Sequence, residues 1–135
     1  MNDLFADTGY WIGLINRRDH LHAKIGALRA KLGTFSLVTS EMVLAEFLNG
    51  VSNDGHLRKA AVVIVDSMRA MKSATVVSQT PDQFQAAIQR YKHSIDNEWS
   101  LTDCSSFLIM EERGIRAALT HDLHFVQAGF DALLR

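Results

Sequence analysis

The sequence lacks several features that define whole classes of protein. It has one cysteine, Cys104, among 135 residues, so no disulfide can form within the chain and we expect a reducing compartment. No apolar run approaches the ~18 residues that a membrane-spanning helix requires, so we expect no association with a membrane. The opening MNDLFADTGYW carries acids where a signal peptide carries basic residues. We therefore expect a cytoplasmic protein.

Neither sign of charge dominates the chain. Fourteen lysines and arginines stand against 15 acids, which gives a net charge of −1. This balance excludes a wholly basic protein, so any surface that binds a polyanion must be a local patch. The hydrophobic content of 47% and the charged content of 21% are typical of a soluble globular protein. Because we find no repeat, low-complexity stretch or linker, we predict a single domain over residues 1–135.

Short apolar runs and helical apolar stripes alternate along the chain. The runs predict strands at 3–7, 35–40, 74–78 and 115–120, and a short fifth strand at 130–134. Between them, apolar residues recur at helical spacing, most clearly over 57–71. No hairpin signal joins consecutive strands. The pattern therefore predicts an α/β fold in which helices cover both faces of a parallel sheet.

Acidic residues stand at the ends of these predicted elements. Asp7 ends the first strand, Asp122 lies just past the fourth, and Asp103 falls in the first turn of the helix before the fourth strand. In open parallel sheets the working crevice lies beyond the carboxyl ends of the strands, where the strand order reverses. If the order reverses after three strands, strands one and four are neighbours, and Asp7 and Asp122 face one another. Asp103 could reach the same crevice.

Each acid also has a structural interpretation. Asp7 could cap the first helix, and Asp103, three residues after Ser100, could be the acid of a capping box. Glu46 lies on the polar face of a helix predicted at 41–51, where a solvated charge is the default. Asp122 could close an Asx-turn. Three of the four acids nevertheless lie at element ends on the predicted crevice side, which favours a shared site.

A cluster of carboxylates requires a counter-charge. Two carboxylates about 4 Å apart repel by about 4 kcal/mol at an effective dielectric near 20. A hard divalent cation with oxygen ligands relieves that repulsion, and Mg²⁺ and Mn²⁺ suit carboxylate sites that keep several waters. Such sites typically act on phosphates, because the metal activates water and stabilises charge on the phosphoryl oxygens.

Four segments of the chain, taken together, resemble a known family. They are FADTGYWIGLIN, TSEMVLAEFLNG, WSLTDCSSFLIMEERGI and ALTHDLHFVQAGF. In this order and at these spacings they are similar to the motifs of PIN-domain ribonucleases, in particular the small VapC-type toxins of prokaryotic toxin–antitoxin pairs. The last segment follows the closing T-x-D-x-x-F-x-x-x-G-F pattern of that family. The resemblance covers nearly the whole chain.

The resemblance implies a fold and a reaction. The fold would be a three-layer α/β/α sandwich with a central parallel sheet of four to five strands. The reaction would be metal-dependent endonucleolytic hydrolysis of a phosphodiester in structured RNA, either a tRNA or an exposed ribosomal RNA loop. Asp7 and Asp103 would hold the principal Mg²⁺ or Mn²⁺. Glu46 and Asp122 would complete the metal-binding acidic site and help position or deprotonate the attacking water.

The resemblance also implies supporting residues and partners. Thr8 and Thr120 would supply supporting hydroxyls beside the acids. Members of the family commonly form homodimers, and the peptide of a cognate antitoxin protein blocks their acidic groove. We therefore expect an RNA substrate, an antitoxin and a second copy of the chain as partners.

Other functions fit the sequence less well. A phosphorelay receiver domain needs a lysine after its last strand, and no lysine follows Lys92. A catalytically silent PIN-like module that binds RNA or protein would be expected to lack an acid, and none is missing. Zinc sites at His20 and His22 or at His121 and His124 lack a cysteine partner or an HExxH pattern. We expect these histidines to lie on the surface at element ends, and contact of His121 or His124 with substrate stays open.

Overall fold

A five-stranded parallel sheet forms the centre of the protein. The structure is a computed structural model that describes residues 2–135. Its strands are β1 (Asp3–Ala6), β2 (Ser36–Ser40), β3 (Ala74–Val77), β4 (Ala117–Leu119) and β5 (Asp131–Ala132). They lie in the order β3-β2-β1-β4-β5, and every neighbouring pair is parallel. The sheet expected from the alternating pattern is confirmed.

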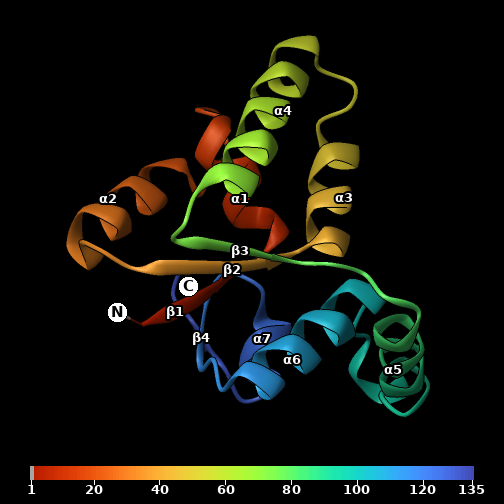
Figure 1. The fold of residues 1–135 in the computed structure, drawn as a ribbon. Helices are drawn as coiled ribbons and strands as arrows, with labels where there is room; N and C mark the ends of the chain where they lie inside the picture. The colour runs from red at the N-terminus through yellow and green to blue at the C-terminus, as the bar shows by residue number, and fades with distance from the viewer. Residues whose placement is uncertain (1) are drawn as a thin grey trace.

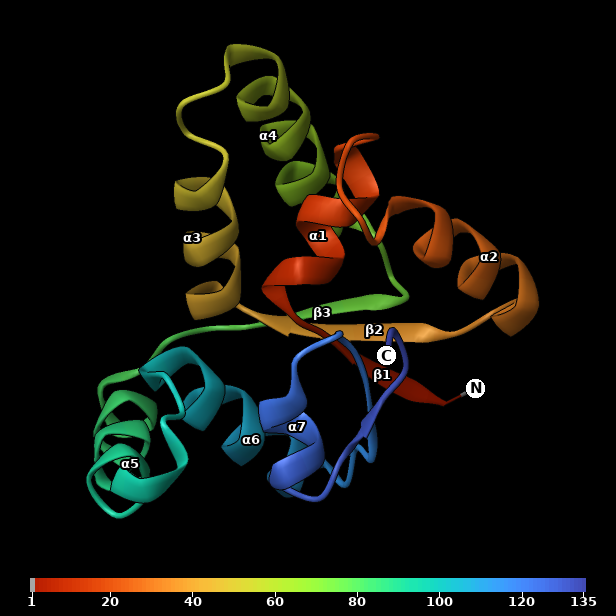
Figure 2. The same ribbon diagram turned by 180° about the vertical axis from the view of Figure 1, so that it is seen from behind.

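Helices cover both faces of the sheet, as Figures 1 and 2 show. On one face lie α1 (Thr8–Ile15), α2 (His22–Leu32), α3 (Glu41–Gly50) and α4 (Gly55–Ala70). On the other lie α5 (Pro81–Lys92), α6 (Leu101–Arg113) and α7 (Leu123–Gln127), with a short 3₁₀ helix η1 (Ile95–Asn97) between α5 and α6. This is the α/β/α sandwich that the sequence predicted. The short helix α7 was not expected, because only five residues form it. Within residues 2–135 no helix combines the length and the apolar character needed to cross a membrane.

The strand order reverses at β1. β1 pairs with β2 on one side, where Leu4 lies opposite Leu37, and with β4 on the other, where Phe5 lies opposite Ala118. The reversal after three strands, which the sequence left as a condition, is therefore present. This reversal places the carboxyl ends of β1 and β4 side by side, and the candidate site lies there. The segment after Ala6 and the segment after Leu119 begin at the same edge of the sheet.

Aromatic packing fixes the helices that begin near this edge. Trp11 of α1 contacts Phe47 of α3, with ring centroids 6.3 Å apart. On the opposite face Phe107 of α6 meets Phe125 of α7 edge-to-face at 4.9 Å. All four side chains are buried. Such buried aromatic pairs contribute beyond their area, and here they set where the helices lie relative to one another.

The helix ends follow the signals in the sequence. Thr80 and Gln83 form a capping box at the start of α5, with Pro81 at the first helical position. Ser100 and Asp103 form a second capping box at the start of α6. Gly114 ends α6 with a φ of 67°, a left-handed conformation that glycine adopts without steric cost.

Candidate metal centre

Asp7 follows β1 and points into the protein. Its backbone is extended and stands at the N-cap of α1, but its side chain makes no capping hydrogen bond. Instead the Thr120 hydroxyl donates to Oδ2 of Asp7 at 2.8 Å, which joins the ends of β1 and β4. Asp7 is only 8% exposed. The helix-cap interpretation of this acid is therefore wrong, and its carboxylate is held at the sheet edge.

Burial changes the protonation of Asp7. The pKa of its carboxyl is raised to about 7, chiefly by removal from water; the Thr120 hydroxyl opposes the shift, and the negative charges of Asp103 and Asp122 add to it. The charges that act on Asp7 show that these two acids are its electrostatic neighbours. A carboxyl that holds a proton near neutral pH is one that a bound cation would ionise.

Asp103 forms the predicted capping box and also faces a side chain of α7. Its Oδ2 accepts a hydrogen bond from the Ser100 backbone N–H at 3.1 Å, and its own N–H donates to Ser100 Oγ at 3.0 Å. It is 7% exposed, and burial raises the pKa of its carboxyl, against the opposing effect of His124. Asp103 thus completes the capping box of α6, and its carboxylate also meets His124 of α7.

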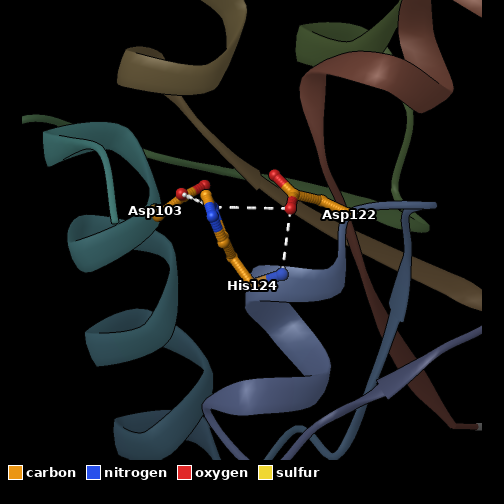
Figure 3. A group of neighbouring side chains, drawn as sticks. All are labelled: Asp103, Asp122 and His124. Atoms are coloured by element: carbon orange, nitrogen blue, oxygen red, sulfur yellow. Dashed lines mark hydrogen bonds and ion pairs between the residues drawn. The ribbon is translucent and has the colours of Figure 1, made fainter. Parts of the chain in front are cut away.

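Asp122 and His124 stand at the start of α7 (Figure 3). The Asp122 N–H donates to the Thr120 hydroxyl oxygen at 3.1 Å, and its Oδ1 accepts from the His124 N–H at 2.9 Å. Asp122 therefore caps α7, which agrees with its interpretation as a local turn residue. It remains half-buried, and its charge reaches Asp7 and Asp103.

The imidazole of His124 lies between two of the acids. Its Nδ1 is 2.9 Å from Oδ2 of Asp103 and 3.4 Å from Oδ1 of Asp122. Because an ionised carboxylate only accepts hydrogen bonds, Nδ1–H is the donor in this contact when Asp103 is ionised. His124 lies at a helix start and is 30% exposed, as expected, but its side chain faces the acids and does not project freely into solvent. His121 and His20 are exposed, and their rings contact each other edge-to-face at 5.7 Å.

Glu46 lies at the margin of this cluster. It is exposed on α3, and its Oε1 accepts a hydrogen bond from the Thr8 hydroxyl at 2.7 Å. Thr8 follows Asp7 directly, so the contact links Glu46 to the segment that carries the buried acid. The structure brings Asp7, Asp103 and Asp122 into mutual electrostatic contact, whereas Glu46 joins them through its hydrogen bond to Thr8.

The donor set fits a divalent cation. Three possible ligand atoms, one from each of Asp103, Asp122 and His124, lie within 4.8 Å of one another. Among residues 2–135 no other group of three histidines, cysteines or acids comes this close together. Asp7 adds a buried carboxyl beside them. Carboxylate oxygens suit Mg²⁺ and Mn²⁺, and one imidazole nitrogen suits transition-metal ions. Sequence reasoning did not identify His124 as part of this group, because nothing local indicates that its ring meets α6.

The fold and the acidic centre define a class of protein. The family model of the PIN domain matches residues 4–131, so the chain belongs to the PIN-domain family. The expected resemblance to VapC-type PIN proteins is confirmed by its relatives. The chain is 30% identical over 128 residues to the 23S rRNA-specific endonuclease VapC20 of two Mycobacterium tuberculosis strains, across 94% of this chain and 95% of the relative.

A solved structure agrees with this relationship. The crystal structure of Mycobacterium tuberculosis VapC20, described as a Sarcin-Ricin loop cleaving toxin, superposes on the protein with a TM-score of 0.83 at 28% identity. The match covers 94% of this chain and 95% of that structure. The two chains therefore share one fold over nearly the whole length of each.

Proposed function

We propose that this protein is a metal-dependent endoribonuclease that hydrolyses a phosphodiester in a structured RNA, and that it is the toxin of a toxin–antitoxin pair. The observation that carries the proposal is the convergence of Asp7, Asp103 and Asp122 where β1 and β4 end side by side. The similarity to VapC20, a 23S rRNA-specific endonuclease, supports an exposed ribosomal RNA loop as the substrate in preference to a tRNA.

In this proposal some of the acids bind the cation and another positions the attacking water. Asp7 and Asp103 would hold Mg²⁺ or Mn²⁺, with Asp122 completing the metal site and Glu46 at its margin. When bound, the cation supplies positive charge beside the scissile phosphate and activates water. The Thr120 hydroxyl fixes the Asp7 carboxylate. The Thr8 hydroxyl holds Glu46 where this acid can orient or deprotonate the attacking water.

A cleavage assay tests the proposal directly. The full-length protein is incubated with a hairpin that carries the sarcin–ricin loop, a tRNA and a scrambled hairpin, each with Mg²⁺, with Mn²⁺ or with EDTA. We expect a single cut in the loop hairpin with either metal and none in EDTA. Undiminished cutting in EDTA, by protein free of other nucleases, would exclude the metal mechanism. Preferential cutting of the tRNA would show that tRNA, and not the ribosomal RNA loop, is the substrate.

The same assay separates the nuclease from a catalytically silent module. A silent PIN-like module would bind the hairpin in a gel-shift experiment and leave it intact in every metal. Binding through a basic patch should also weaken as salt rises, because phosphate contacts release counterions. Specific binding without cleavage would therefore favour the silent module over the nuclease.

We further propose a cognate antitoxin, a homodimer and a cytoplasmic location. The similarity to VapC20, a Sarcin-Ricin loop cleaving toxin, supports an inhibitory protein partner. The exposed side chains of Val62 and Val63 on α4 offer apolar surface for a protein contact. Light scattering of the purified protein gives its mass and tests the dimer. Coexpression with the neighbouring reading frame should relieve growth arrest if that frame encodes the antitoxin.

A further inference from the structure

We propose that His124 is a nitrogen ligand of the cation at this centre, and that this ligand makes the centre prefer Mn²⁺ to Mg²⁺. The inference rests on the proposed metal-dependent function and deepens it. The four acids alone would form an all-oxygen site, for which Mg²⁺ is a natural occupant. A directly bound imidazole would change that preference.

The position of the imidazole is that of a ligand. Its Nδ1 lies 2.9 Å from Oδ2 of Asp103 and 3.4 Å from Oδ1 of Asp122, and the three ligand atoms lie within 4.8 Å of one another. Around an octahedral ion with bonds of about 2.1 Å, neighbouring ligands lie about 3 Å apart and opposite ligands about 4.2 Å apart. The three atoms therefore need to move by less than about 1 Å to surround an ion. Nδ1 binds the ion in the neutral tautomer that carries its proton on Nε2, so the bond to the metal replaces its hydrogen bond to Asp103.

The surrounding structure holds the imidazole at this position. The backbone N–H of His124 donates to Oδ1 of Asp122, which fixes the two residues relative to each other. The next residue, Phe125, is fully buried and packs on Phe107 of α6, the helix that carries Asp103. The side chain of His124 is still 30% exposed, so an ion from solvent can reach it. Figure 3 shows the ring facing both carboxylates.

The chemistry of the donor predicts the preference. Mg²⁺ binds oxygen ligands and keeps several waters, whereas imidazole is a better ligand for transition-metal ions. Loss of the nitrogen should thus weaken Mn²⁺ binding more than Mg²⁺ binding. The opposing possibility is that His124 only links the two carboxylates as a hydrogen-bond donor and turns away when an ion binds. In that case Mn²⁺ would have no nitrogen neighbour.

Spectroscopy of the wild-type protein decides between these two arrangements. Metal-free full-length protein is loaded with Mn²⁺, and electron spin echo modulation reports a directly bound ¹⁴N. The same measurement on protein labelled with ¹⁵N-histidine identifies the nitrogen as imidazole. We expect a ¹⁴N coupling that changes to ¹⁵N on labelling. Bound Mn²⁺ without a nitrogen coupling would overturn the assignment, and this result needs no variant.

Calorimetry of matched variants tests the preference. His124→Asn places an amide near the position of Nδ1, which can still donate a hydrogen bond to Asp103 but offers no imidazole. His121→Asn is the control, because His121 is exposed and lies outside the cluster. We expect His124→Asn to weaken Mn²⁺ binding by about 10-fold or more, the scale seen when partners of metal sites are removed. Mg²⁺ binding should change little, and His121→Asn should match wild type.

The outcomes for the ligand and for the proposed function are distinct. Equal weakening of both ions by His124→Asn would refute the preference. If wild-type protein cuts RNA only with added metal but shows no nitrogen coupling, the nuclease stands and the ligand assignment fails. If wild-type protein binds neither ion and cuts RNA in EDTA, the proposed metal-dependent function itself fails.

Discussion

The hydroxyl of Thr120 donates a hydrogen bond of 2.8 Å to Oδ2 of Asp7, across 113 positions of sequence. Both residues are buried, and each follows one of two paired strands at the reversal of the sheet. The same hydroxyl oxygen accepts the N–H of Asp122. One side chain therefore sets the positions of two acids that reach the sheet edge from opposite ends of the chain.

Replacement of this hydroxyl should loosen the centre. Thr120→Val keeps the volume of a side chain that is 1% exposed but leaves a buried carboxylate oxygen and a backbone N–H without their partner. We expect a loss of roughly 1–3 kcal/mol in the free energy of unfolding, measured with urea. Thr120→Ser restores the hydroxyl and should recover both stability and cleavage. Equal stability of the valine and wild-type proteins would contradict the role assigned to this bond.

The stability of the metal-free protein should fall as pH rises. Burial raises the pKa of Asp7 from 3.8 to about 7, so the folded protein binds this proton more tightly than the unfolded chain. The stability that Asp7 contributes is therefore greatest below about pH 4, falls between about pH 4 and 7 as the unfolded chain ionises first, and levels off above. The loss from this group is at most about 4 kcal/mol.

Urea unfolding of metal-free protein at several pH values measures this loss. Asp7→Asn carries no titratable group and should remove most of the decline, so the variant should be more stable than wild type at about pH 8. Added Mn²⁺ should offset the decline in wild type and have little effect on the variant. Parallel pH profiles of the two proteins would show that Asp7 is not the titrating acid.

Substitution of Asp103 separates its two roles. Asp103→Asn keeps a hydrogen-bond acceptor for Ser100 and removes a charge that burial disfavours. We expect metal-free protein to melt at the same or a higher temperature, to gain less from Mg²⁺, and to lose cleavage by at least about 100-fold, since loss of a partner of the metal already costs 10–100-fold.

Ser100→Ala is the matched control for this variant. It removes the hydroxyl that caps α6 but leaves the Asp103 carboxylate in place. It should cost about 1 kcal/mol of stability and retain cleavage. An Asp103→Asn protein that is less stable than wild type and still cuts RNA would assign this acid to the helix cap alone.

Glu46 should matter for cleavage and little for folding. Glu46→Gln keeps the shape of an exposed side chain and its contact with Thr8, so we expect the free energy of unfolding to stay within about 0.5 kcal/mol. Cleavage should fall by about 100-fold or more if this acid orients or deprotonates the water. Asp66→Asn, an exposed acid of α4, should change neither quantity. Full activity of the Glu46 variant would show that Glu46 is not needed for cleavage and that the other acids form the site.

The sequence by itself determined the architecture and the helix starts. The alternation of apolar runs with helical stripes led to a parallel sheet between two helical layers, and Thr80 and Ser100 marked the starts of α5 and α6. These features depend on residues a few positions apart, so they can be read along the chain. From the sequence alone the reversal of strand order could only be assumed, and the pairing of β1 with β4 in the structure establishes it.

Only the tertiary structure decided what each acid contacts. The direction of a side chain at a helix start depends on what packs around that helix, and this packing involves residues far apart in the sequence. The seating of Phe125 on Phe107 brings α7 against α6 and aims His124 at Asp103. By contrast, the placement of α3 leaves Glu46 exposed at the margin, in contact with Thr8. The sequence identified the acids, and long-range packing added an imidazole among them.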